Sequence, residues 1–195
     1  MQRSYVLKAR AKTQEETRQR IVASAAELHE EIGAKATTIS AIAERAGVQR
    51  LTVYRHFSDE SELFTACTTY WLHLNPLPDP SAWAQLSGMR KCREALSALY
   101  AYYRKTERMW EMAHRDEPDV PALKPPMDRF RDYLSEIADD LAKNLAPTRN
   151  TRKAVSVTLA HILRFTTWQS LATEGLTDDG MARLACDWLA SVERR

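Results

Sequence analysis

The chain has 195 residues, which is enough for one large domain or for two smaller domains that share an interface. Hydrophobic residues make up 44% and charged residues 28%, as in ordinary globular proteins, and no apolar run is long enough for a membrane span. The three cysteines, Cys67, Cys92 and Cys186, are far apart and odd in number. Together with the lack of a secretory signal, this argues against a disulfide framework and predicts a protein of the reducing cytoplasm.

The charge is unevenly distributed along the chain. The net charge is only +2, but residues 1–57 hold 10 Lys and Arg against 6 Asp and Glu, whereas residues 58–195 hold 18 against 20. A positive excess in one segment is typical of a surface that contacts nucleic acid. The first twelve residues include four basic residues and no acid, and they are predicted as a flexible tail. The alternative is a basic arm that contacts phosphates or a minor groove.

The sequence predicts an all-α fold of about nine helices, because Gly is scarce and alternating β-branched runs are few. The first helix is predicted to begin at Thr13, in the capping box Thr13-Gln-Glu-Glu16, and to end at Gly33. Its apolar stripe consists of Ile21, Val22, Ala25, Leu28, His29 and Ile32.

Residues 37–57, with the sequence TTISAIAERAGVQRLTVYRHF, have the pattern of a helix-turn-helix. Thr37 or Thr38 is placed to cap the first helix, and Gly47 follows its last apolar residue. The small Ala43 permits the close crossing of two helices, and Val53 of the second helix faces inward. An ordinary corner between two helices is the alternative.

Six further helices are predicted beyond this segment. They cover the residues from Ser58 to 74, then 89–105, 106–115, 127–145, 151–173 and 178–192, with Pro-rich loops at 76–80 and 118–126. The last two helices are apolar on more than one face, which favours a second chain as a partner. The predicted homodimer interface consists of Val155, Leu159, Ile162, Met181, Leu184, Ala185, Trp188 and Leu189; the alternative is that these residues are internal core.

Three segments of this chain resemble the TetR family of bacterial transcription regulators. They are TTISAIAERAGV at 37–48, VYRHF at 53–57 and ELF at 62–64. The resemblance implies a DNA-binding domain at 1–57 and a ligand-binding and dimerisation domain at 58–195. It also implies a homodimeric repressor that a small molecule releases from a pseudo-palindromic operator.

The resemblance also implies which residues contact DNA: Thr38, Ser40, Gln49, Arg50, Leu51, Thr52, Tyr54 and His56. Arg50 and Gln49 are suited to bidentate pairing with guanine and adenine, whereas Tyr54 and His56 correspond to the family's phosphate contacts. Two positions depart from the family pattern. Glu60 replaces a frequent phosphate-binding Lys, and Leu51 replaces a frequent Gly.

A pocket for an apolar or aromatic effector is predicted from the aromatic residues of the larger domain. The candidates are Trp71, Tyr100, Tyr103, Met109, Trp110, Phe130, Tyr133, Arg164, Phe165 and Trp168, with Trp83 beside them; plain core is the alternative. No hydrolase, metalloprotease or phosphate-loop motif is present, so an enzyme, a cofactor and a metal are not expected. The alternative function is a constitutive or activating DNA-binding regulator without an inducer pocket.

Overall fold

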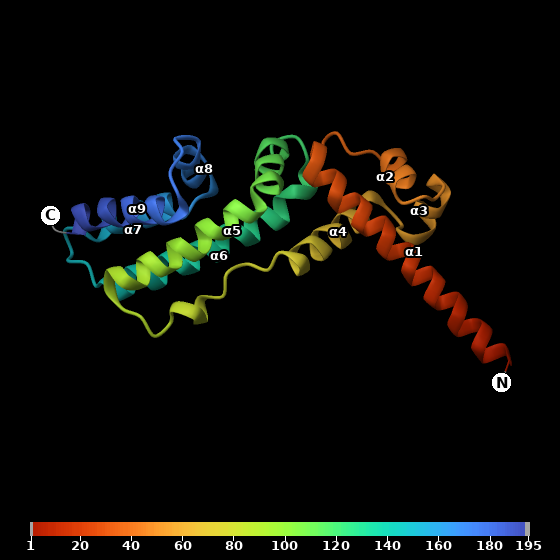
Figure 1. The fold of residues 1–195 in the computed structure, drawn as a ribbon, viewed down its shortest axis with the longest axis horizontal. Helices are drawn as coiled ribbons and strands as arrows, with labels where there is room; N and C mark the ends of the chain where they lie inside the picture. Colours follow the sequence, from red (N-terminus) through yellow and green to blue (C-terminus); the bar gives the residue numbers. More distant parts are fainter. Residues whose placement is uncertain (1, 194–195) are drawn as a thin grey trace. The chain divides into compact units, whose positions relative to one another are not determined.

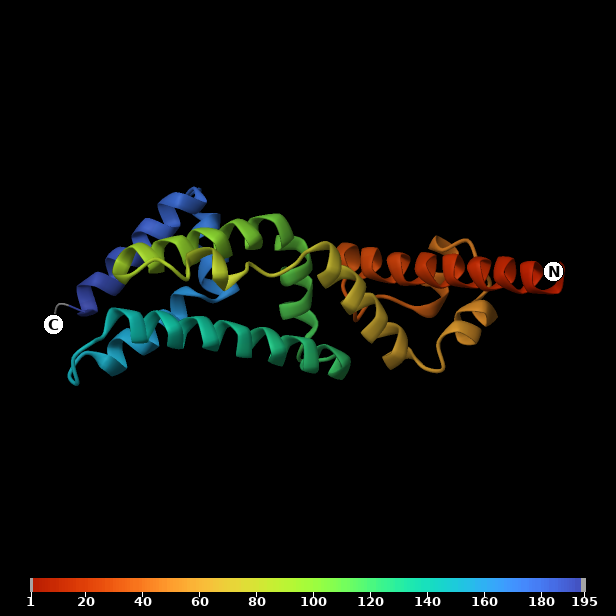
Figure 2. The ribbon, with the colours of Figure 1, turned by 90° about the horizontal axis from the view of Figure 1, so that it is seen from below.

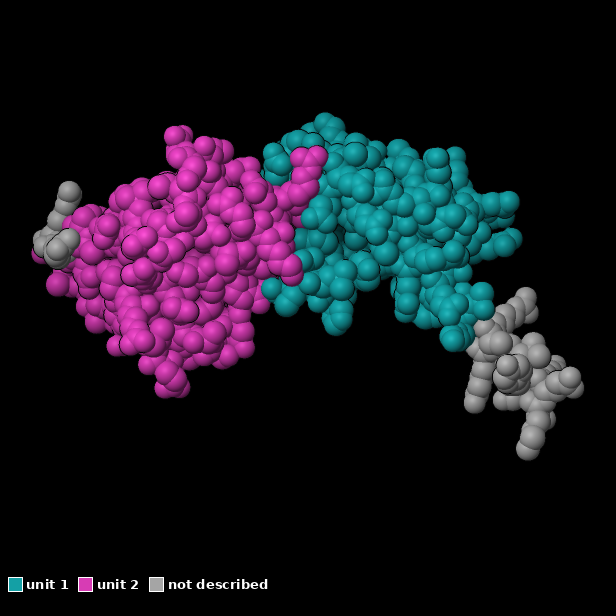
Figure 3. Space-filling view, in the orientation of Figure 1, with its two compact units in different colours: residues 1–76, 111–125 teal, residues 77–110, 126–195 magenta. Residues whose placement is uncertain are grey.

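The computed structural model describes the backbone of residues 2–193 and the side chains of residues 11–193. Within this part of the chain, nine α-helices and two 3-10 helices are the only regular structure (Figure 1). The all-α prediction is therefore confirmed. None of the described helices contains an apolar stretch long enough to cross a bilayer. The chain forms two compact units: unit 1 contains residues 1–76 and 111–125, and unit 2 contains residues 77–110 and 126–195 (Figure 3).

Unit 1 is a helical bundle arranged around its first helix. Helix α1 (Gln2–Ile32) packs against α2 (Ile39–Arg45), α3 (Arg50–His56) and α4 (Glu60–Leu74) (Figures 1 and 2). The apolar stripe predicted on α1 supplies much of the core, although Ile32 is 40% exposed. The buried apolar side chains of the bundle include Ile21, Ala25, Leu28, Ile42, Ala43, Val53, Phe57, Leu63, Cys67 and Trp71.

Helix α1 begins at Gln2, so the predicted start at Thr13 is wrong. The capping-box pattern lies inside the helix, where the Thr17 hydroxyl donates to the Thr13 carbonyl oxygen at 2.9 Å. The residues before Thr13 contain neither Gly nor Pro, and most of them are good helix formers, so nothing stops the helix there. The backbone of the predicted flexible tail is therefore helical from Gln2; the side chains of its residues 1–10 lie outside the described part of the chain.

Unit 1 is completed by a segment that is distant in sequence. Helix α5 (Gly88–Asp116) ends in unit 1, and the 3-10 helix η2 (Pro121–Leu123) follows it there. The next helix, α6 (Lys124–Leu145), begins at Lys124 rather than at the predicted Met127, because proline is tolerated in the first turn of a helix. The functional division predicted between residues 57 and 58 stays a prediction.

Helix α5, most of which lies in unit 2, joins the two predicted helices 89–105 and 106–115 into one element. Thr106 has non-helical angles, with φ −115 and ψ 15, so the predicted boundary coincides with a kink. The Thr106 hydroxyl donates to the Tyr102 carbonyl oxygen at 2.6 Å inside the protein. The unit also contains η1 (Pro80–Trp83), α7 (Arg152–Ile162), α8 (Phe165–Thr173) and α9 (Asp178–Glu193).

The predicted single helix 151–173 is broken into α7 and α8 at Leu163 and Arg164. The carbonyl oxygens freed at the break accept hydrogen bonds from α5. The Tyr100 hydroxyl donates to Ile162 O and the Tyr103 hydroxyl donates to Leu163 O, each at 2.7 Å. Because a buried carbonyl without a partner is costly, these two hydroxyls stabilise the corner.

Six residues of the predicted dimer interface lie in the chain's own core. They have no exposed surface and are Val155, Leu159, Ile162, Met181, Ala185 and Leu189. A side chain that is fully buried within one chain cannot contact a second chain, so the prediction is wrong for these six. These six residues form a buried apolar seam because α7 packs against α9. The remaining two residues are accessible: Leu184 is half-buried and Trp188 is 37% exposed.

Candidate DNA-binding surface

Helices α2 and α3 are joined by the tight turn that the sequence predicts. Thr38 caps α2, because its hydroxyl oxygen accepts from the Ala41 N–H at 3.2 Å. Gly47 has φ +65, a left-handed conformation that Gly adopts at little cost. The Val48 N–H then donates to Ala43 O at 2.9 Å, which closes the turn. The local geometry is that of a helix-turn-helix.

The inner side of α3 is anchored in the core of unit 1. Val53 and Phe57 are 1% and 2% exposed, and burial of each such side chain contributes roughly 1.5–3 kcal/mol. The Arg18 guanidinium of α1 lies 4.7 Å from the centre of the Phe57 ring. These contacts fix the rotation of α3 about its axis and thereby determine which side chains face outward.

The outward side of α3 carries the residues predicted to contact DNA. Leu51 and Tyr54 are 57% and 46% exposed, and Gln49 and Arg50 are also exposed. Thr52 and His56 are half-buried. An exposed Leu beside Arg and Gln suits a surface that contacts base edges, where an apolar side chain can contact a thymine methyl group.

Helix α2 is held against α1 by an ion pair. The Arg45 guanidinium donates to both carboxylate oxygens of Glu31 at 2.7 Å. The carboxylate–guanidinium hydrogen bonds lower the pKa of Glu31, and the same pairing raises the pKa of Arg45. Thr38 and Ser40 remain exposed at the start of α2. The Arg45 side chain is therefore bonded to another residue of the bundle.

A groove of about 480 Å³ adjoins this surface within unit 1. It brings together four of the eight predicted contact residues: Thr38, Ser40, Arg50 and Tyr54. The other four, Gln49, Leu51, Thr52 and His56, do not line the groove. Glu60 and Ser61 at the start of α4 form part of its wall, so the groove carries a carboxylate at the position where the family frequently has a phosphate-binding Lys.

Sequence reasoning missed two residues of the groove, Val120 and Ala122. They follow α5 and lie more than sixty residues after the helix-turn-helix, so no local pattern connects them with it. The inner wall is formed by His29 and Phe64, whose ring centres are 5.2 Å apart. The groove therefore combines an apolar wall with the polar and basic side chains of α2 and α3.

His29 is held in its neutral form. Its Nδ1 lies 3.4 Å from the Cys67 sulfur, and burial lowers its pKa from 6.5 to about 4, although the negative charge of Asp116 acts in the opposite direction. Burial also raises the pKa of the Cys67 thiol to about 12. His29 is thus packed on the apolar stripe predicted for the first helix.

Most of the predicted effector-pocket residues form one aromatic cluster in unit 2. Phe130 is central, because its ring centre lies 4.0 Å from that of Trp110, 6.0 Å from Tyr133 and 6.2 Å from Tyr103. Phe165 and Trp168 continue the cluster at 5.4 and 5.9 Å from Tyr103. Tyr102, which was not predicted, joins it at 6.3 Å from Trp110.

Several polar groups of this cluster already have partners within unit 2. Tyr100 and Tyr103 donate to the α7–α8 corner, and the Tyr133 hydroxyl donates to Pro78 O at 2.6 Å. The Arg104 guanidinium lies 4.9 Å from the centre of the Trp168 ring and bonds to Asp178. Elsewhere in unit 2, the buried Trp83 indole N–H has no acceptor among the described residues.

Three predicted pocket residues do not belong to this cluster. Trp71 lies on α4 in unit 1, Arg164 is an exposed N-cap of α8, and Met109 is half-buried. Residue type alone predicts Trp71 as a pocket residue, and no local pattern in the sequence links it with the other aromatic residues. The unit 2 cluster therefore replaces the longer list as the candidate effector site.

The helix-turn-helix geometry and the exposed side of α3 are those of a DNA-binding element. Residues 21–67 match the family of bacterial regulatory proteins called the tetR family. No curated protein matches the chain significantly. Among solved structures, a TetR-like transcriptional regulator from Rhodococcus sp. RHA1 superposes with a TM-score of 0.66 and 19% identity, over 89% of this chain and 93% of that one.

NalD, the secondary repressor of the MexAB-OprM multidrug efflux pump in Pseudomonas aeruginosa, superposes with a TM-score of 0.57 and 20% identity. The match covers 93% of this chain and 97% of NalD. These low identities establish a shared fold, and the family match establishes the DNA-binding element. Residues 21–67 thus carry the DNA-binding element of the tetR family, and the chain as a whole shares the fold of TetR-like regulators.

Proposed function

We propose that this regulator is a homodimeric repressor that binds a pseudo-palindromic operator and is released by a small apolar or aromatic molecule. The proposal rests chiefly on the outward side of α3. Arg50, Leu51 and Tyr54 are exposed, whereas Val53 and Phe57 hold the opposite side in the core. An α-helix presented in this way enters a major groove and places its first residues against base edges.

Arg50→Ala is expected to relax base preference. A bidentate arginine–guanine pair discriminates by roughly 1–3 kcal/mol, so the variant should lose affinity for the best operator and lose little for operators altered at the contacted base. Affinities would be measured on a set of operators with single base changes, at one fixed salt concentration.

Tyr54→Phe is the matched comparison from the same helix, because it removes only a hydroxyl that we assign to a phosphate contact. This variant should weaken binding to every operator by a similar factor. An equal loss on all operators for Arg50→Ala would contradict the assignment of Arg50 to a base edge.

The proposed dimer uses the exposed residues of α7 and α9 in place of the buried seam. Val157 is 60% exposed and Trp188 is 37% exposed, and exposed Ala154 and His161 share the Val157 side of α7 at helical spacing. Large apolar side chains left in water on such helices favour a second copy.

Sedimentation at micromolar concentration is expected to give the mass of a dimer. Val157→Asp is expected to lower the measured mass towards that of a monomer.

The aromatic cluster of unit 2 is the proposed effector site. Its rings suit a ligand with an aromatic or apolar body. NalD represses a multidrug efflux pump, which favours a lipophilic compound here as well.

Titration with lipophilic cations, aromatic acids and acyl thioesters should quench tryptophan fluorescence in a saturable way. The same compound should weaken operator binding, because a ligand shifts an equilibrium only through its different affinity for the two states. Helix α5 carries residues of both units. An absence of saturable quenching by any compound would favour the alternative, a constitutive or activating regulator without an effector.

A further inference from the structure

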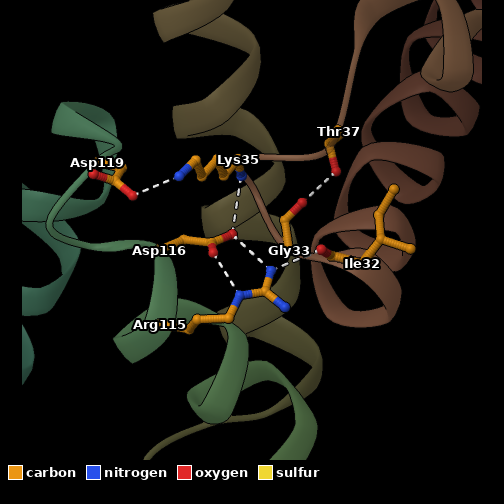
Figure 4. A network of polar contacts seen from close by, with 7 residues as sticks. All are labelled: Ile32, Gly33, Lys35, Thr37, Arg115, Asp116 and Asp119. Atoms are coloured by element: carbon orange, nitrogen blue, oxygen red, sulfur yellow. Dashed lines mark hydrogen bonds and ion pairs between the residues drawn. The ribbon is translucent and has the colours of Figure 1, made fainter.

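Unit 1 contains a buried carboxylate that belongs to neither α2 nor α3. The side chain of Asp116, the last residue of α5, is 2% exposed. Its Oδ1 accepts from Arg115 Nε at 2.7 Å, and its Oδ2 accepts from Arg115 Nη2 at 3.2 Å (Figure 4). These hydrogen bonds lower the pKa of Asp116, so the carboxylate is charged at neutral pH.

The same two side chains hold the turn between α1 and α2. Asp116 Oδ2 accepts from the Lys35 backbone N–H at 3.0 Å, and Arg115 Nη2 donates to Ile32 O at 2.8 Å (Figure 4). The turn is therefore bonded through one donor and one acceptor of its backbone. Gly33 lies between these bonds with φ +89, and a Cβ there would overlap both Arg115 and Asp116.

The turn leads directly into the proposed DNA-binding surface. The Thr37 hydroxyl donates to Gly33 O at 2.7 Å, and Thr38, the next residue, caps α2. Val120 and Ala122, which follow Asp116 closely, line the same groove as Thr38 and Arg50. The end of α5 thus contacts the backbone that sets the start of α2.

We propose that Asp116 and Arg115 are positioning residues for DNA binding, which fix the turn 33–37 and with it the α2 residues that contact the operator. This inference rests on the proposed function. It places a determinant of DNA affinity about sixty residues beyond the helix-turn-helix, in a segment that no DNA-binding motif covers. Both hydrogen bonds join a side chain to a backbone atom of the turn. The effect on DNA affinity therefore depends on the Asp116 carboxylate and the Arg115 guanidinium, and it does not depend on the residue type at position 35.

The test compares operator binding by Asp116→Ala and Asp116→Asn with that of the wild-type chain. Removing a negative charge from a DNA-binding protein should, by long-range electrostatics alone, leave affinity unchanged or raise it. Positioning predicts the opposite sign: roughly a tenfold loss for Asp116→Ala and a smaller loss for Asp116→Asn, whose amide oxygen can still accept from Lys35. The slope of log affinity against log salt should stay that of the wild type, because Asp116 touches no phosphate.

Asp119→Asn is the matched control. It removes the ion pair between Asp119 and the Lys35 side chain, which is 2.7 Å long but exposed, and it leaves the backbone bonds in place. This variant should bind the operator as the wild type does. Amide exchange at Lys35 and Ala41 should accelerate in Asp116→Ala and not in the control.

Wild-type affinity in both folded Asp116 variants would overturn the positioning role. Global unfolding of both variants at 25 °C would also overturn it, because the Asp116–Arg115 network would then be required for folding and not specifically for DNA binding. If the wild-type chain binds no operator, the proposed function fails rather than the network.

Discussion

Gly33→Ala is expected to destabilise unit 1 by roughly 3 kcal/mol. A residue with a side chain at φ +89 costs about 1–2 kcal/mol in backbone strain. The added Cβ also displaces the Arg115 guanidinium and the Asp116 carboxylate, and loss of hydrogen bonds to such a buried charge costs about 1–3 kcal/mol. Amide exchange of helices α1 to α4 in the native state would measure the change for unit 1 alone.

Gly47→Ala is the control for backbone strain. Gly47 has φ +65 in the same unit, but a Cβ there meets no atom within 4 Å, so only the strain of about 1–2 kcal/mol is expected. The difference between the two variants isolates the contact with Arg115 and Asp116. Equal destabilisation by both would show that the network tolerates a side chain at position 33.

Lowering the pH from 7 to 5 is expected to destabilise unit 1 by about 2 kcal/mol through His29. Its pKa is about 4 in the folded protein and near 6.5 when unfolded, so between these values the unfolded chain binds a proton that the folded chain excludes. Stability therefore rises with pH through this window and levels off above 6.5. Burial beside Cys67 and Phe64 is the cause, and it outweighs the attraction of Asp116.

His29→Leu should flatten this dependence, whereas His73→Leu should retain it, because His73 on α4 is exposed. Measurements are best kept above about pH 4.5. Below that value protonation of Glu31 and Asp116, whose pKa values are lowered by their arginine partners, adds a further loss of stability. Chemical denaturation at each pH, followed by amide exchange in α1, gives the measurement. A pH-independent difference between wild type and His29→Leu would contradict the assignment.

The helix-turn-helix could be predicted because its determinants are local. Thr38, Ala43, Gly47 and Val53 lie within one short segment, and each has a role that its residue type and spacing indicate. The fold class followed from composition and helical periodicity for the same reason. Local patterns of this kind are consistent with the global fold in most of the chain.

The remaining features depend on contacts between residues that are far apart in sequence. The break between α7 and α8 relies on the hydroxyls of Tyr100 and Tyr103, some sixty residues earlier. The periodicity of α7 and α9 showed an apolar seam correctly but did not show that each helix covers the other, so six core residues were predicted as a dimer interface. The Asp116 network likewise joins positions about eighty residues apart.

The dimeric, sequence-specific binding proposed here can be tested by selecting bound duplexes from random-sequence DNA with the wild-type protein. We expect enrichment of one motif with two inverted half-sites whose centres are about one helical turn apart or slightly more. The bases under α3 should include a guanine that Arg50→Ala no longer selects. Recovery of DNA with no common motif, or of a single unpaired half-site, would contradict the account of a dimeric, sequence-specific regulator.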